Sequence, residues 1–568
     1  MVSVSTPHHG LNSYTLSRRW QNAIALFIVL LFFLFNVLSV QGFDWTYDEP
    51  DHYKYGMNIL HGNSTRFDDS KMPISAWNAL PAWIADLLPD GSMKAFLKEL
   101  STARLMTTLF SMTVAFMVFY WARELYGWIP ALLSLILYVL DPNIIAHSQL
   151  VTTDIYITGM LLFSTYWLWR YANERKWQNG LWLLLTLGLA QLTKYTAVSL
   201  FGLFAVALLV YDWSSLKKNE GAKRWQEIRR TTWQYAKYGF FALAVSIIII
   251  NFGFLFNRTF TSLRDYSFRS ELFRSVQSNI SFRVPVPYPY LEGLDLIIQR
   301  ERTNTGFGRI YLLGETRFAK GFPGYYFIAS ALKMPIATQV VLFCALFVYW
   351  RDRQRKEKFL RNEWFLLLPV LFYTIYFNFF YRAQIGIRYY LIVFPLLYVF
   401  AAGLLVHWRD FRRWQKLSVV SLGFYLLISV LSYYPSYLAY FNEIVWDRKT
   451  AYQYLADSNL DWGQDGLILE HYLSDHPYVQ EAPMKPALLQ APVSYYLEVN
   501  RFLGITVEPV TYEWLRENFK PVDTIASSYL LFEITPDQMR ELCERTAYCK
   551  QEYERYTGKD PSHAIWQK

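Results

Sequence analysis

The sequence is built around a succession of apolar runs, each bounded by polar or charged residues. A transmembrane helix needs about 20 largely apolar residues. The eleven runs that approach this length are Ala23–Phe43, Leu105–Trp121, Trp128–Leu140, Leu150–Trp169, Leu181–Leu192, Ala197–Tyr211, Tyr238–Phe256, Tyr325–Trp350, Trp364–Phe380, Tyr389–Val406 and Leu417–Tyr434. The 568-residue chain is therefore predicted to be an α-helical integral membrane protein with about 11 transmembrane helices. The first run is too long for the apolar core of a signal peptide, so we expect a retained helix.

The distribution of basic residues supports this count. Lys and Arg prefer cytoplasmic loops, and Arg18-Arg19 precede the first run. Alternating crossings bring four further basic segments to the same side, namely Arg170–Lys176, Lys217–Lys237, Arg351–Arg361 and Arg409–Lys416. We therefore expect a multi-pass protein of the inner (cell) membrane with a cytoplasmic N-terminus. An odd number of crossings leaves the C-terminal region extracytoplasmic.

The same topology predicts the domain organisation. Residues 1–434 are expected to form a transmembrane module with extracytoplasmic loops 44–101 and 257–324. The two runs within Leu181–Tyr211 are short and are predicted to form a hairpin that does not quite cross the bilayer. Residues 435–568 are polar and of mixed charge, and are numerous enough to fold as a soluble mixed α/β extracytoplasmic domain.

Charge and cysteine content limit the other classes of function. The formal net charge is +9, but the basic residues lie in short segments between apolar runs, so we expect no nucleic-acid partner. Cys344 lies in an apolar run and is expected to be inert. Cys543 and Cys549 could form a small disulfide loop or remain two free thiols. Their spacing matches no metal site.

An acidic pair, Asp48-Glu49, follows the first apolar run and precedes Pro50. One interpretation is structural, because acidic residues followed by proline are typical of a helix start. The other is a general base held at the boundary between water and lipid, where partial desolvation raises a carboxylate's pKa and makes it a better base.

Three cations are expected on the same outer face. Arg382 and Arg388 lie in a short connection that the topology places outside, against the usual preference of basic residues. Lys194 lies at the tip of the predicted hairpin. The guanidinium group is well shaped to bind a phosphate, and a buried lysine needs an anionic partner. The alternative is that all three side chains simply reach the lipid headgroups.

Asp154 lies near the outer end of the fourth run. It could orient a substrate, ligate a divalent cation, or cap the following helix. The sequence indicates no certain cofactor, and a divalent cation is the one candidate. It contains no P-loop, no G-x-S-x-G elbow, no H-E-x-x-H and no dinucleotide fingerprint. An enzyme with this outer face would therefore need an activated donor delivered within the membrane.

An ordered set of strings resembles a known family. Besides Asp48-Glu49, these strings are Ala146–Asp154, Leu192–Ala197, Gly324–Phe327, Lys333–Pro335, Ile385–Tyr390, Tyr440–Glu443 and Asp457–Asp465. Together they resemble lipid-carrier-dependent glycosyltransferases of the GT-C fold, in particular the bacterial type of the protein O-mannosyltransferase-like group (glycosyltransferase family 39). Tyr389 stands where the family has His as often as Tyr.

This resemblance implies a reaction and a set of roles. A sugar, with mannose as the first candidate, would pass from a polyprenyl-phosphate donor to a hydroxyl on a protein, lipid or glycan, with inversion. Asp48 would be the base and Glu49 would position the acceptor or the base. Lys194 and Arg388 would hold the lipid phosphate, with Arg382 a weaker candidate and Tyr389 beside them. The family pattern includes Asp457–Asp465, which could contact the acceptor or cap a helix.

Two other classes of membrane protein are alternatives. A transporter or lipid flippase would carry charges near the bilayer midplane and often repeated halves, whereas here the charges gather at one face and no repeat is visible. A structural membrane subunit would leave the combination of Asp48, Lys194 and Arg388 unexplained. Membrane lipids are partners in every case.

Overall fold

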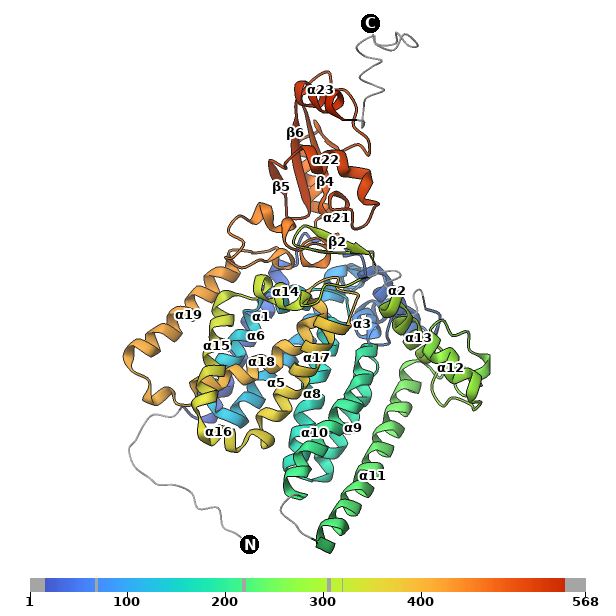
Figure 1. The fold of residues 1–568 in the computed structure, drawn as a ribbon, viewed down its shortest axis with the longest axis vertical. Helices are drawn as coiled ribbons and strands as arrows, with labels where there is room; N and C mark the ends of the chain where they lie inside the picture. The colour runs from blue at the N-terminus through green and yellow to red at the C-terminus, as the bar shows by residue number, and fades with distance from the viewer. Residues whose placement is uncertain (1–15, 67–69, 217–220, 304–307, 319, 547–568) are drawn as a thin grey trace.

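A bundle of long helices carries a small sheet-containing region at one end, which is the upper end in Figure 1. The computed structural model describes residues 16–66, 70–216, 221–303, 308–318 and 320–546. Within these ranges, 7 helices are long and apolar enough to cross a membrane, or up to 9 if each of two bent pairs is one span. The predicted class, an α-helical multi-pass membrane protein, is therefore confirmed.

Each predicted apolar run coincides with a helix of the bundle. These helices are α1 (Arg18–Ser39), α5 (Leu100–Tyr126), α6 (Trp128–Val139), α8 (Asp154–Asn173), α9 (Trp177–Ala190), α10 (Ser199–Leu216), α11 (Gly221–Gly253), α15 (Ile336–Arg351), α17 (Glu363–Ile375), α18 (Phe394–Ala401) and α19 (Arg413–Leu431). The predicted count of eleven crossings is not confirmed, because the described residues give seven to nine spans.

Two of the predicted runs differ in shape from a simple span. The run Tyr325–Trp350 forms two helices, α14 (Tyr325–Lys333) and α15, bent by 115°. Pro335 lies at the break, where its missing N–H and its ring prevent one helix from continuing. The second arm of the predicted hairpin is longer than expected. A 3₁₀ turn at Tyr195–Val198 extends α10, and Tyr195–Trp213 is long enough to cross.

The upper end of the bundle is covered by short elements from the connecting segments. They are α2 (Glu49–Leu60), α3 (Ser75–Asp86), α4 (Ser92–Lys98), α7 (Pro142–Ser148), α12 (Glu271–Asn279), α13 (Tyr288–Thr303), α14, and a hairpin of β1 (Arg309–Leu312) and β2 (Glu315–Phe318). The side chain of Asp141 caps α7 by accepting hydrogen bonds from the backbone N–H groups of Asn143 and Ile144.

The C-terminal region contains a four-stranded sheet of order β3-β4-β6-β5. Its strands are β3 (Val479–Glu481), β4 (Val493–Glu498), β5 (Asp523–Ile525) and β6 (Tyr529–Ile534), and its helices are α20 (Gly466–Asp475), α21 (Val499–Phe502), α22 (Glu513–Asn518) and α23 (Pro536–Arg545). Strands β3 and β4 are parallel, and the other two pairs are antiparallel. Cys543 of α23 is disulfide-bonded, and Cys549 lies outside the described residues. The boundary at residue 434 stays a prediction.

Residues from distant parts of the chain meet where the sheet-bearing region joins the bundle (Figure 1). The loop after α1, the first turn of α8, the 3₁₀ turn before α10 and a 3₁₀ segment at Ile387–Val393 all lie at this end. The Ile387–Val393 segment packs on α7, α8 and α14 and precedes α18. Six of the seven candidate side chains belong to these segments or directly adjoin them, and Arg382 lies in the connection before Ile387–Val393.

Candidate functional site

The carboxylate of Asp48 forms an ion pair with Arg388. The distance from Arg388 Nη1 to Asp48 Oδ2 is 2.8 Å. Asp48 is the N-cap residue of α2 by position, but its side chain makes no capping hydrogen bond. Its side chain is 28% exposed, whereas that of Arg388 is 7% exposed. The pair is therefore open to a ligand on the side of the carboxylate and enclosed on the side of the cation.

A second ion pair joins Lys194 to Asp154, with 2.7 Å between Lys194 Nζ and Asp154 Oδ1. Asp154 is the first residue of α8, and Thr153 takes the N-cap position, so Asp154 is not the predicted cap. The ring of Tyr389 connects the two pairs. Its centroid lies 4.2 Å from Lys194 Nζ and 5.2 Å from Arg388 Cζ. Five of the seven predicted residues thus form one cluster.

Several buried polar atoms in this cluster lack a partner. Arg388 Nε is buried and has no hydrogen-bond partner in the part of the chain that the structure describes. His147 Nδ1 and Thr152 Oγ1, close to Asp154 in the sequence, are also buried without a hydrogen-bond partner among the described residues. A buried donor left unpaired costs about 1–3 kcal/mol. Such atoms in a native site indicate that a ligand or water completes their hydrogen bonds.

Lys71 and His52 also lie near this cluster, although no role is predicted for either of them. Burial opposes the charge of Asp48, but Arg388, Lys71 and His52 together hold its pKa well below the usual range. Burial, assisted by the positive charge of Lys71, lowers the pKa of His52 to about 3. His52 is therefore neutral at physiological pH, and its Nδ1 lies 3.2 Å from Ser75 Oγ.

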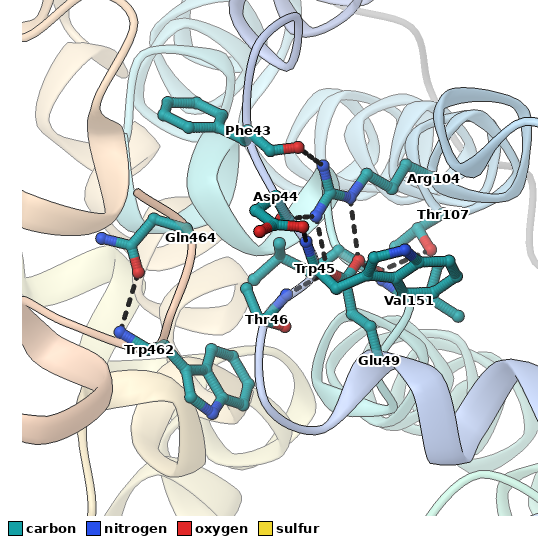
Figure 2. Close-up of polar contacts among 11 residues, drawn as sticks. Phe43, Asp44, Trp45, Thr46, Glu49, Arg104, Thr107, Val151, Trp462 and Gln464 are labelled. Atoms are coloured by element: carbon teal, nitrogen blue, oxygen red, sulfur yellow. Dashed lines mark hydrogen bonds and ion pairs between the residues drawn. The ribbon is translucent and has the colours of Figure 1, made fainter. Parts of the chain in front are cut away.

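Glu49 faces the interior instead of the cluster (Figure 2). Arg104 of α5 binds it through two donors, with Nε 2.9 Å from Oε1 and Nη2 2.6 Å from Oε2. The backbone N–H groups of Thr46 and Val151 also donate to it, each over 2.8 Å. These contacts fix the loop that carries Asp48. A role of Glu49 in positioning the base or the acceptor stays a prediction.

Arg104 is a residue that sequence reasoning missed. It is 2% exposed, and it also donates to the backbone oxygens of Phe43 and Asp44 (Figure 2). The available signal was an arginine at the very start of an apolar run, since ionisable residues at membrane helices are retained for a reason. Arg382, in contrast, is exposed and donates to the backbone oxygen of Arg302 at the end of α13.

The segment Asp457–Asp465 contacts both loops of the site. Trp462 O accepts a hydrogen bond from Tyr47 N, and Gln464 O accepts one from Asp44 N, each over 3.0 Å. On the other side, Asn459 Oδ1 accepts a hydrogen bond from Ile387 N over 2.9 Å. This segment therefore does more than cap a helix, because it lies between the loop of Asp48 and the loop of Arg388.

Metal binding has no support among the described residues. No group of three or more His, Cys, Asp or Glu side chains in them has an arrangement that could hold a metal ion. Asp154, the residue predicted as a candidate ligand, is paired with Lys194. The chemistry that this cluster offers is that of a partly exposed carboxylate beside an arginine with an unused donor.

Residues 80–249 match the family model of dolichyl-phosphate-mannose-protein mannosyltransferase. The match confirms the predicted resemblance to protein O-mannosyltransferase-like GT-C enzymes over this part of the chain. It includes Asp154 and Lys194, whereas Asp48 and Arg388 lie outside it. No curated protein matches the chain.

Two solved structures are similar at low identity. ArnT from Cupriavidus metallidurans bound to undecaprenyl phosphate has 12% identity and a TM-score of 0.47, with 91% of this chain and 98% of that chain covered. The archaeal oligosaccharyltransferase AglB from Archaeoglobus fulgidus, in complex with an inhibitory peptide and a dolichol-phosphate, has 12% identity and a TM-score of 0.46, with 95% and 78% covered.

Proposed function

We propose that the protein is a membrane glycosyltransferase that moves a sugar from a polyprenyl-phosphate-linked donor to a hydroxyl acceptor. The observation that carries this proposal is the pair of Asp48 and Arg388, in which a partly exposed carboxylate meets an arginine with an unused buried donor. The carboxylate suits proton abstraction and the arginine suits a phosphate. The family match over residues 80–249 supports the same class of reaction.

Asp48 is the base in this proposal. Its carboxylate takes the proton from the acceptor hydroxyl as the acceptor oxygen bonds to the anomeric carbon of the donor sugar. The bond from that carbon to the phosphate oxygen breaks on the opposite side, and polyprenyl phosphate leaves with the electron pair. The configuration at the anomeric carbon is therefore inverted. Arg388 and Lys194 stabilise the negative charge that develops on the leaving phosphate.

The ion pairs suggest how donor binding prepares the base. While Arg388 holds Asp48, the pKa of Asp48 stays far below that of a useful base. A donor phosphate that takes over the donors of Arg388 removes this effect and raises the pKa of Asp48. Lys194 would exchange Asp154 for the phosphate in the same way. The base is then active only when the donor is bound, which limits reaction in its absence.

The end of the bundle that carries the sheet is the outer face in this proposal. The N-terminus and the basic segments then lie in the cytoplasm, and residues 435–568 form an extracytoplasmic domain at the inner (cell) membrane. Mannose is the first sugar to test, because the matching family is named for it. The acceptor is a protein, a lipid or a glycan with a free hydroxyl group.

The test is sugar transfer by the purified full-length chain, with polyprenyl-phosphate mannose as donor and the products identified by mass spectrometry. Asp48→Asn should lose transfer by a factor of about 10²–10⁴ and keep its folding and its binding of undecaprenyl phosphate. Asp90→Asn, a change at a 96% exposed carboxylate on a neighbouring loop, is the matched control. Full activity of Asp48→Asn would exclude the base assignment. Comparing the glycans, lipids and proteins of cells with and without this chain identifies the acceptor.

A further inference from the structure

The guanidinium group of Arg388 lies over the indole ring of Trp462. Arg388 Cζ is 4.0 Å from the centre of the Trp462 ring, and Trp462 is 6% exposed. A guanidinium on the face of a tryptophan is held by a cation–π attraction that is strongest where water is excluded. The ring covers the guanidinium on one side, while Arg388 Nη1 donates to Asp48.

The position of Trp462 is itself fixed from two sides. The backbone oxygens of Trp462 and Gln464 accept hydrogen bonds from the loop 44–47. Figure 2 shows both residues beside this loop. From the sheet side, Asn500 in α21, directly after β4, donates to the backbone oxygen of Asp461 over 3.0 Å. Ser528 Oγ donates to Asp465 Oδ2 over 2.6 Å. The ring is thus carried by a segment anchored in both the sheet and the bundle.

The loop of Arg388 also approaches this segment very closely. Ser458 Oγ donates to the backbone oxygen of Ile385, and a Cβ atom at Gly386 would collide with Ser458 Oγ. Gly386 has a φ of 130°, a conformation that other residues rarely adopt. The backbone of the Arg388 loop is therefore held against the segment that carries Trp462. This close approach brings the guanidinium group of Arg388 to the indole ring of Trp462.

We propose that Trp462 is a positioning residue, which orients Arg388 toward the donor phosphate and toward Asp48. This inference rests on the proposed function for its role in the reaction, whereas the orientation of Arg388 can be tested separately. The ring does not touch the reacting atoms in this proposal. It keeps the guanidinium in one orientation, so that Arg388 can exchange its hydrogen bond to Asp48 for one to the phosphate while the side chain stays in position.

The first measurement concerns Arg388 alone and needs no substrate. Phenylglyoxal modifies accessible guanidinium groups, and peptide mass spectrometry gives the rate at Arg388. In Trp462→Ala the rate should rise about tenfold, because the covering ring is gone. Trp462→Phe, which keeps a flat ring, and Trp446→Ala, which removes a 91% exposed indole, should leave the rate unchanged. An unchanged rate in Trp462→Ala would overturn the proposal.

The second measurement is a double-mutant cycle on the kcat/KM for the donor. Loss of a desolvated cation–π contact predicts that Trp462→Ala lowers kcat/KM about 10- to 30-fold, mainly through the donor KM, and that Trp462→Phe restores most of it. In an Arg388→Gln background, Trp462→Ala should have almost no further effect. Additive losses would show that Trp462 acts on something other than Arg388 and would also overturn the proposal. If the wild-type chain transfers no sugar, the proposed function fails, and the phenylglyoxal rates still decide whether Trp462 holds Arg388.

Discussion

Glu49 and Arg104 form an ion pair that is almost completely buried, with side chains 0% and 2% exposed and Arg104 Nη2 2.6 Å from Glu49 Oε2. The pair closes the loop between α1 and α2, because the same guanidinium also binds the backbone oxygens of Phe43 and Asp44. Asp48 is carried on this loop. The two neighbouring acids therefore differ in surroundings. Glu49 binds Arg104 and the backbone in the interior, and Asp48 lies beside Arg388 in the candidate site.

This difference predicts different phenotypes for the two neighbours. Removing one partner of a buried ion pair costs about 3–5 kcal/mol, because the remaining charge is left without compensation. Arg104→Met should therefore lower the thermal unfolding midpoint strongly, and Glu49→Gln should do so as well. Asp48→Asn should lower it less, because the Asp48 side chain is 28% exposed and its loss leaves only Arg388 without its partner. Arg317→Met, which breaks an exposed ion pair with Glu315, is the control and should have almost no effect. Equal midpoints for Arg104→Met and wild type would contradict this prediction.

Arg388 should not tolerate replacement by lysine. A lysine keeps the charge but loses the planar fork and the stacking on Trp462. We expect Arg388→Lys to weaken undecaprenyl phosphate binding by about tenfold or more. Lys194→Arg keeps both charge and hydrogen-bonding capacity and should be milder. Binding is measured by titration of the purified variants. Wild-type affinity in Arg388→Lys would mean that charge alone is recognised.

Asp457 should make stability depend on pH. Burial raises its pKa from 3.8 to about 6, against the lowering effect of Arg388. A raised folded-state pKa stabilises the fold below the unfolded value of 3.8, and this contribution is lost as the pH rises through about 6. The shift corresponds to about 3 kcal/mol. Asp457→Asn should therefore match the wild type near pH 4 and be more stable at pH 7.

The measurement is the unfolding midpoint of wild type and Asp457→Asn across pH 4 to 8. Part of the slope should remain in the variant, because burial also raises the pKa of Asp461 and of Glu498. Asp537→Asn, at an 88% exposed carboxylate of α23, is the control. Parallel curves for wild type and Asp457→Asn would show that the Asp457 proton is not coupled to folding.

Gly386→Ala should separate the Arg388 loop from the segment that carries Trp462. The new Cβ would meet Ser458 Oγ, and the φ of 130° would strain any side chain. We expect a destabilised protein with a large loss of transfer activity. Gly314→Ala is a matched control for the backbone, because Gly314 has a φ of 88° but open space around its Cβ. Loss of activity in Gly386→Ala alone would identify the close approach, not the backbone conformation, as the cause.

The local pattern of the sequence determined the class of this protein. Apolar runs of helical length, separated by basic or polar segments, predict membrane-spanning helices. In lipid the backbone N–H and C=O groups find no water, so they must be hydrogen-bonded within the helix. The pattern predicts eleven spans, whereas seven to nine helices of the described residues meet the length and hydropathy needed to cross. Length and hydropathy do not reveal a bend such as the one at Pro335, where a single run becomes two helices.

Which charges meet was decided only by the tertiary structure. Asp48 and Arg388 are 340 residues apart and pair because two loops converge at one end of the bundle. Both residues are candidate site residues in the sequence analysis, one as a base and one as a phosphate ligand. The sequence could not show that their charges neutralise one another. Neither the pairing of Arg104 with Glu49 nor the contact of Trp462 with Arg388 was predicted, since a single side chain has no period that reveals its partner. The sequence shows which side chains could act as bases or bind anions. Which side chains contact one another is decided by the packing of segments that are distant in the chain.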